Sequence, residues 1–149
     1  MKALITGGSG FIGSNVAKLL LQNGYDVRVL DNLSSGHLIN IEKYINNGDI
    51  EFIKGDICDT DMALKVTKGV DVIFHLAACV GWQKSIDNPQ LDSKTNLLGT
   101  VNILDGMQKN GVNRIVYSSS AAIFGELLTP TIDENHPQNA DSPYDMLVS

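Results

Sequence analysis

A glycine-rich run near the start of the chain has the composition of a phosphate-binding turn. The stretch T-G-G-S-G-F-I-G places Gly7, Gly10 and Gly13 three residues apart, with Phe11 and Ile12 between the last two. Glycines at this spacing let the chain turn sharply, let a pyrophosphate approach backbone N–H groups, and let a helix pack closely on a strand. We interpret these five residues as candidate dinucleotide contacts, with a purely structural turn as the alternative.

An acidic residue follows the glycines at the distance that such a site requires. Asp31 stands 18 residues beyond Gly13, at the end of a predicted strand, where a carboxylate can accept hydrogen bonds from ribose hydroxyls. Its charge would repel a 2′-phosphate and no arginine follows it, so NAD is favoured over NADP. Asn32 joins it as a candidate contact. A turn-capping role for Asp31 is the alternative.

A second candidate pair follows the third predicted strand in the run G-D-I. Asp56 and Ile57 could lie around an adenine ring, or they could form a plain turn at the end of a strand. The chain has no Gly-Lys-Ser or Gly-Lys-Thr of a P-loop, which sets aside a mononucleotide kinase or a GTPase.

Short β-type runs that alternate with segments of helical period must position these residues. We predict strands at 3–6, 27–31, 52–54, 70–76 and 115–118. Helices are predicted between the first two strands, at 39–45, from an N-cap at Thr60, and from Pro89 to Asn110. The long last helix carries one apolar face, formed by Leu97, Val101, Leu104 and Met107.

Strict alternation of strands and helices predicts a single α/β domain over residues 1–149. Right-handed crossovers that return to one sheet favour a doubly wound parallel sheet of the Rossmann type. From Glu126 the pattern ends, and about 24 residues with Pro130, Pro137 and Pro143 form no periodic element. We therefore expect a Rossmann fold that is incomplete at its C-terminal end.

Composition restricts the kind of ligand. The chain has a net charge of −6 and no cluster of Lys or Arg, which argues against nucleic acid or an anionic membrane as partner. No apolar stretch approaches the ~18 residues of a membrane span, and the N-terminus lacks a signal-peptide core. Cys58 and Cys79 are expected as reduced thiols, with no metal site and a cytoplasmic location.

Seven motifs lie along residues 1–144. In chain order they are T-G-G-S-G-F-I-G, V-L-D-N-L-S-S-G, F-I-K-G-D-I-C-D, V-I-F-H-L-A-A, N-L-L-G-T, V-Y-S-S-S-A-A-I-F-G, and D-E-N-H-P with S-P-Y. Together they resemble the extended short-chain dehydrogenase/reductases, in the NAD-dependent epimerase/dehydratase group that acts on nucleotide sugars. The resemblance runs from Met1 to Tyr144, and the chain is most similar to the UDP-glucose 4-epimerase branch.

The resemblance implies further roles beside the cofactor. Ala77 and Ala78 would leave room for NAD, and Asn96 would be the buried asparagine near the cofactor site. Close packing and a surface polar residue are the respective alternatives.

The resemblance also implies two catalytic residues. Ser120 would hydrogen-bond the sugar hydroxyl that is oxidised, with Ser118 and Ser119 as alternatives. Tyr144 would be the catalytic base. Because a phenol ordinarily has a pKa of about 10, such a base needs a nearby positive charge.

The motif Tyr-x-x-x-Lys is incomplete, because Val148 stands where the family has lysine. We therefore expect the N-terminal NAD-binding portion of a nucleotide-sugar epimerase, truncated or ended by a shifted reading frame and inactive alone. Such a chain would associate through its exposed sheet edge or form a homo-oligomer. A non-catalytic NAD-binding or docking module is one alternative. A dehydratase or reductase of the same family is another, although Ser120-Ala121-Ala122 lacks the dehydratase Asp-Glu pair.

Overall fold

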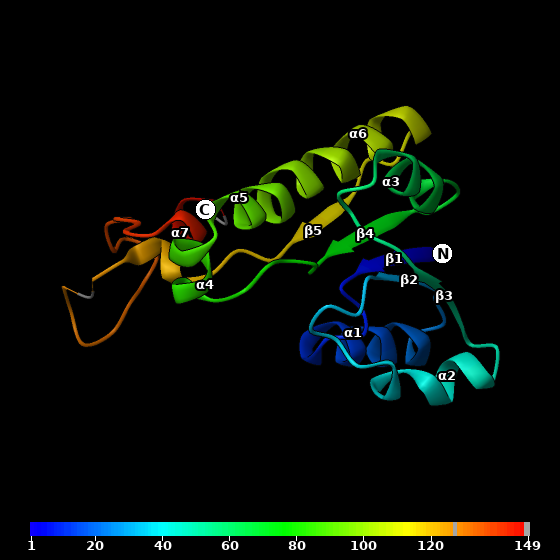
Figure 1. Cartoon of the computed structure of the whole chain (residues 1–149). Coiled ribbons are helices and arrows are strands. Elements are labelled where there is room, and N and C mark those ends of the chain that lie inside the picture. The colour runs from blue at the N-terminus through cyan, green and yellow to red at the C-terminus, as the bar shows by residue number, and fades with distance from the viewer. Residues whose placement is uncertain (127, 148–149) are drawn as a thin grey trace.

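The computed structural model describes residues 1–126 and 128–147, in which a central sheet lies between two groups of helices (Figure 1). All neighbouring strands are parallel, and their order is β3-β2-β1-β4-β5. This is the doubly wound sheet that the sequence predicts. The strands are β1 (Lys2–Thr6), β2 (Asp26–Asp31), β3 (Ile50–Lys54), β4 (Val72–His75) and β5 (Ile115–Tyr117).

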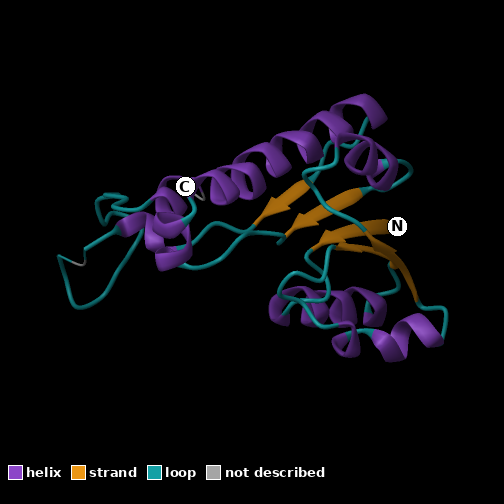
Figure 2. Cartoon of the chain, viewed as in Figure 1, coloured by secondary structure: helices purple, strands orange, loops and turns teal. Residues whose placement is uncertain are grey.

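Helices cover both faces of the sheet (Figure 2). One group, α1 and α2, packs on one face, and α3 and α6 pack on the other. The helices are α1 (Phe11–Gln22), α2 (Glu42–Asn46), α3 (Thr60–Thr67), α4 (Trp82–Asp87), α5 (Pro89–Asp92), α6 (Thr100–Asn110) and α7 (Pro143–Leu147). Shorter turns are the 3₁₀ segments η1 (Leu38–Asn40) and η3 (Ala121–Phe124) and the π-helical segment η2 (Ser93–Gly99).

The two cores follow from the alternation of side chains along the central strand. Ala3 and Ile5 of β1 face α1, whereas Leu4 faces α3 and α6, and all three are fully buried. Successive residues of a strand point to opposite faces, so a strand that is covered on both sides is apolar throughout. Polar residues of such a strand therefore lie at its ends rather than in its middle.

The long helix predicted after Pro89 is three pieces. Asn88 caps α5 through its side-chain oxygen, which accepts the Leu91 N–H at 3.1 Å. The π-helical segment η2 then separates α5 from α6. The expected N-cap at Thr60 was wrong, because Asp59 caps α3. Helix α4, around Trp82, has no counterpart among the predicted helices.

The apolar face predicted for the long helix is only partly buried. Met107 packs in the core, whereas Leu97, Val101 and Leu104 are about half exposed. The buried side of the same helix carries Gly99 and Gly106 instead. A Cβ at Gly99 would lie 2.5 Å from Ile57 Cδ1, and one at Gly106 would lie 2.7 Å from Thr67 Oγ1. Glycines let α6 approach α3 and the sheet closely, and this approach decides which face is buried.

The chain after β5 holds more structure than its sequence suggests. Although 126–149 show no period, α7 forms at Pro143–Leu147 and packs against α4 and η3 (Figure 1). Among the described residues, β5 is the last strand on its side of the sheet. No helix in the described part of the chain is long and apolar enough to cross a bilayer.

Candidate functional site

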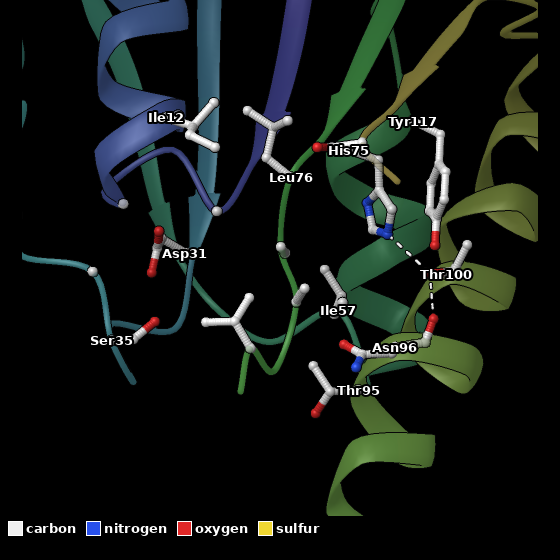
Figure 3. Close-up of a pocket in the computed structure, with 18 of the residues that line it drawn as sticks. Ile12, Asp31, Ser35, Ile57, His75, Leu76, Thr95, Asn96, Thr100 and Tyr117 are labelled. Atoms are coloured by element: carbon white, nitrogen blue, oxygen red, sulfur yellow. Dashed lines mark hydrogen bonds between the residues drawn. The ribbon is translucent and has the colours of Figure 1, made fainter. Parts of the chain in front are cut away.

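A cavity of about 590 Å³ opens at the carboxyl ends of the strands, beside the point where the strand order reverses between β1 and β4 (Figure 3). Ligands of open α/β sheets bind at such a point. Every sequence-predicted site residue lines the cavity except Asp56. These lining residues are Gly7, Gly10, Phe11, Ile12, Gly13, Asp31, Asn32, Ile57, Ala77, Ala78, Asn96, Ser120 and Tyr144.

The glycine-rich turn connects β1 to α1 and forms one wall of the cavity. Gly7 has a φ of +72°, and a Cβ there would lie 2.8 Å from the Ala77 nitrogen. A Cβ at Gly13 would lie 2.3 Å from the Gly7 oxygen. Gly10 caps α1 and has no side chain to occupy the amides of the first helical turn. This wall therefore presents bare backbone N–H groups to a ligand, the arrangement that binds phosphate.

Asp31 ends β2 next to this turn. Its Oδ2 accepts the Ser9 N–H and its Oδ1 accepts the Leu33 N–H, both at 2.8 Å. Each carboxylate oxygen has a second lone pair, so the side chain is held in place and can still accept hydrogen bonds from a ligand. The carboxylate is 8% exposed and lines the cavity.

Asp56 supports the site without facing it. Its Oδ2 accepts from Asn32 Nδ2 at 3.0 Å, and its Oδ1 accepts the Cys58 N–H at 2.8 Å. Burial raises the pKa of Asp56, but these hydrogen bonds outweigh it and leave the pKa below its ordinary value. Asp56 thus orients Asn32, which lines the cavity.

The middle of the cavity is bounded by the chain that leaves β4. Ala77 and Ala78 line it, and their small side chains keep it open. Asn96, which is 3% exposed, fixes the backbone of Cys79, the residue after Ala78. Its Oδ1 accepts the Cys79 N–H at 2.8 Å, and its Nδ2 donates to the Cys79 carbonyl at 3.1 Å. Asn96 is therefore buried, as predicted, and fixes the backbone beside Ala77 and Ala78.

The far end of the cavity carries hydroxyl groups. Ser118, Ser119 and Ser120 follow β5 and all line it, together with Tyr144 from α7. The Ser120 oxygen accepts the Ala122 N–H at 3.2 Å, which leaves its O–H as a donor. Val148 lies outside the described residues. The structure thus brings the serine run and Tyr144 to one cavity.

A second hollow of about 540 Å³ adjoins this end and shares Tyr144. Trp82 of α4 lines it, and so do the acidic residues Glu126, Asp141 and Asp145. In residues 1–126 and 128–147, no three His, Cys, Asp or Glu side chains are grouped so that they could hold a metal ion.

Several lining residues were not singled out from the sequence. Ser35 and Gly36 belong to the segment after Asp31, whose motif was recognised without a role for them. His75, Thr100 and Tyr117 also line the cavity, and the rings of His75 and Tyr117 stack at 5.9 Å. Burial, and to a smaller extent the proximity of Tyr144, raise the pKa of Tyr117.

The cavity fits a dinucleotide. The glycine-rich turn presents unpaired backbone N–H groups, and its glycines leave the space that a pyrophosphate needs. The carboxylate of Asp31 lies beside this turn, where it can accept hydrogen bonds from ribose hydroxyls. Fold and cavity together define a dinucleotide-binding Rossmann unit of the short-chain dehydrogenase/reductase type. The chain belongs to the NAD-dependent epimerase/dehydratase family: the family model described as GDP-mannose 4,6 dehydratase matches residues 4–146.

Curated relatives are nucleotide-sugar enzymes by name. A Methanocaldococcus jannaschii protein provisionally named UDP-glucose 4-epimerase is 45% identical over 95% of this chain, which covers 45% of that protein. The UDP-glucose 4-epimerase of Mycolicibacterium smegmatis is 38% identical over 97% of this chain and 47% of its own length. The chain thus spans about half the length of the curated relatives it matches.

Solved structures show the same fold. The UDP-Glc/GlcNAc 4-epimerase of Campylobacter jejuni matches 99% of this chain and 45% of its own, with a TM-score of 0.92 and 33% identity. The UDP-glucose 4-epimerase of Thermus thermophilus, solved in complex with NAD, matches 99% of this chain and 47% of its own, with a TM-score of 0.88 and 33% identity.

Proposed function

We propose that this chain forms the NAD-binding portion of a nucleotide-sugar epimerase of the UDP-glucose 4-epimerase type. The observation that carries the proposal is a single cavity that joins the glycine-rich turn and Asp31 to Ser120 and Tyr144. The relative from Thermus thermophilus holds NAD in its solved structure, which supports NAD as the cofactor. The sugar nucleotide would be bound largely by residues that lie beyond the matched half of the relatives.

In the proposed reaction the sugar is oxidised at C4 and then reduced from the opposite face. Bound NAD would supply the hydride acceptor and, on return, the hydride donor. Ser120, whose O–H is left as a donor by its bond from Ala122, would orient the C4 oxygen. Tyr144 would take the hydroxyl proton as the hydride leaves and return it afterwards. With Val148 at the lysine position, we expect no turnover from this chain alone.

Calorimetric titration of NAD into the purified chain tests the cofactor site. Asp31→Ala should abolish saturable binding because the ribose acceptor is lost. Gly10→Val should do the same, because its Cβ would already lie 3.2 Å from the Gly7 oxygen and its methyl groups would extend into the cavity. Asp26→Ala, exposed at the opposite end of β2, is the matched control and should bind NAD normally. A folded wild-type chain that does not bind NAD would refute the cofactor assignment.

A second candidate is a binding module that holds NAD without chemistry. Every cofactor glycine is retained although Val148 stands at the lysine position, and this combination fits both candidates. Thermal unfolding of the purified chain without NAD separates the two, because a genuine module should be stable by itself whereas a fragment should be marginally stable and associate. A sharp monomeric melt would favour the module, and a broad melt with association would exclude it. The dehydratase alternative is disfavoured by Ser120-Ala121-Ala122, which lacks the Asp-Glu pair.

A further inference from the structure

A buried histidine links two sides of the cavity and has no role in the proposed chemistry. His75 ends β4 and is 2% exposed. Its ring points toward Thr100 of α6 (Figure 3) and also contacts Thr6 of β1. Its Nδ1 lies 2.8 Å from Thr6 Oγ1, and its Nε2 lies 3.0 Å from Thr100 Oγ1. A buried polar ring with both nitrogens partnered connects separate elements and invites a functional explanation.

Counting donors and acceptors fixes the direction of this chain of hydrogen bonds. Thr6 Oγ1 accepts the N–H groups of Leu76 and Ala77, both at 3.2 Å. A hydroxyl has two lone pairs and one hydrogen, so the Thr6 hydrogen must point to His75 Nδ1. The neutral ring therefore carries its proton on Nε2 and donates it to Thr100. Thr100 in turn donates to the Asn96 carbonyl at 2.7 Å.

The two ends of this series of hydrogen bonds, Thr6 and Asn96, hold the same stretch of backbone. Thr6 fixes the amides of Leu76 and Ala77, and Asn96 fixes both backbone groups of Cys79. The segment between these anchors includes Ala77 and Ala78, which line the cavity. His75 is the connection between the anchors, because Thr6 bonds one of its nitrogens and Thr100, bonded to Asn96, bonds the other.

We propose that His75, in its neutral Nε2–H form, is a positioning residue that joins Thr6 to the Thr100–Asn96 anchor and so holds the backbone of 76–79 in its NAD-binding shape. The inference rests on the proposed NAD site and deepens it. A backbone that is already ordered loses less conformational entropy when the ligand binds. The π-helical segment η2 takes part, because it contains Asn96 and ends at Gly99, directly before Thr100.

Replacing Thr100 interrupts the series of hydrogen bonds and leaves His75 in place. Thr100→Val removes the hydroxyl at nearly constant volume and should weaken NAD binding about tenfold, the effect of one lost hydrogen bond. Thr100→Ser restores the hydroxyl and should return affinity to within about twofold of wild type. Thr67→Val is the matched control, because Thr67 Oγ1 also bonds a helix carbonyl four residues earlier, at 2.9 Å, but does not line the cavity. It should lower the melting temperature and leave NAD affinity unchanged.

Nitrogen NMR of the ¹⁵N-labelled histidine ring gives a readout that needs no NAD. We expect His75 to show a protonated Nε2 and an unprotonated Nδ1 at pH 7 in wild type and in Thr100→Val, with the Nε2 signal shifted in the variant because its N–H loses its acceptor. A proton on Nδ1, or NAD affinity in Thr100→Val equal to wild type, would overturn the inference while the NAD site itself stands. If the wild type does not bind NAD, the proposed function fails, and with it the role of His75 in binding.

Discussion

Acid should destabilise this protein through His75. Burial lowers the pKa of the imidazole from its ordinary value of 6.5 to about 4, so the unfolded chain binds a proton more readily than the folded one. The stability that depends on a neutral ring is complete above pH 6.5 and is lost as the pH falls towards 4. At pH 5 the gap below 6.5 is about 1.5 pH units, which corresponds to about 2 kcal/mol at roughly 1.4 kcal/mol per unit.

Urea unfolding at pH 7 and pH 5 measures this loss. His75→Phe keeps a ring against Tyr117 but cannot be protonated, so it serves as the reference. Carboxylates with lowered pKa values, such as Glu51 and Asp56, also lose stability in acid, but they do so equally in both proteins. Wild type should therefore lose about 2 kcal/mol more than the variant between the two pH values. Equal losses would show that the folded ring titrates normally and that the burial argument is wrong.

Three further outcomes are expected. Gly13→Ala should lower the melting temperature and prevent NAD binding, because the new Cβ would lie 2.3 Å from the Gly7 oxygen; an unchanged melt would contradict the tight turn. Cys58 should react slowly with iodoacetamide at neutral pH, because burial raises the pKa of its thiol to about 11; rapid alkylation, followed by mass spectrometry, would contradict this. Val101→Lys with Leu104→Lys should reduce self-association in sedimentation experiments, because both side chains are about half exposed on α6; unchanged association would place the contact elsewhere.

Local patterns predicted the strands and the glycine-rich turn. Alternation between strand and helix is set by short segments, and the requirement for glycine at Gly7 and Gly13 comes from contacts within one turn and its neighbouring strand. Asp31 was equally predictable, because its position depends only on where β2 ends.

Features that depend on tertiary packing were not predictable in this way. The exposed side of α6 carries Val101 and Leu104, because Gly106 on the opposite side lets the helix approach α3, and a single sequence does not show that approach. Helix α4 is six residues long, which is too short to display a period. The partners of His75 are far from it in sequence, at Thr6 and Thr100, so only the folded chain reveals their connection.

The parallel sheet has a consequence for synthesis on the ribosome. The central strand β1 is made well before β4, its partner on one side, with Ala3 opposite Val72. At about 5–20 residues per second, the chain needs roughly 4 to 14 s to reach that partner. Until then one edge of an apolar strand has no neighbour from its own chain. Chaperones that bind extended apolar segments should therefore meet β1 in the interval before β4 is made.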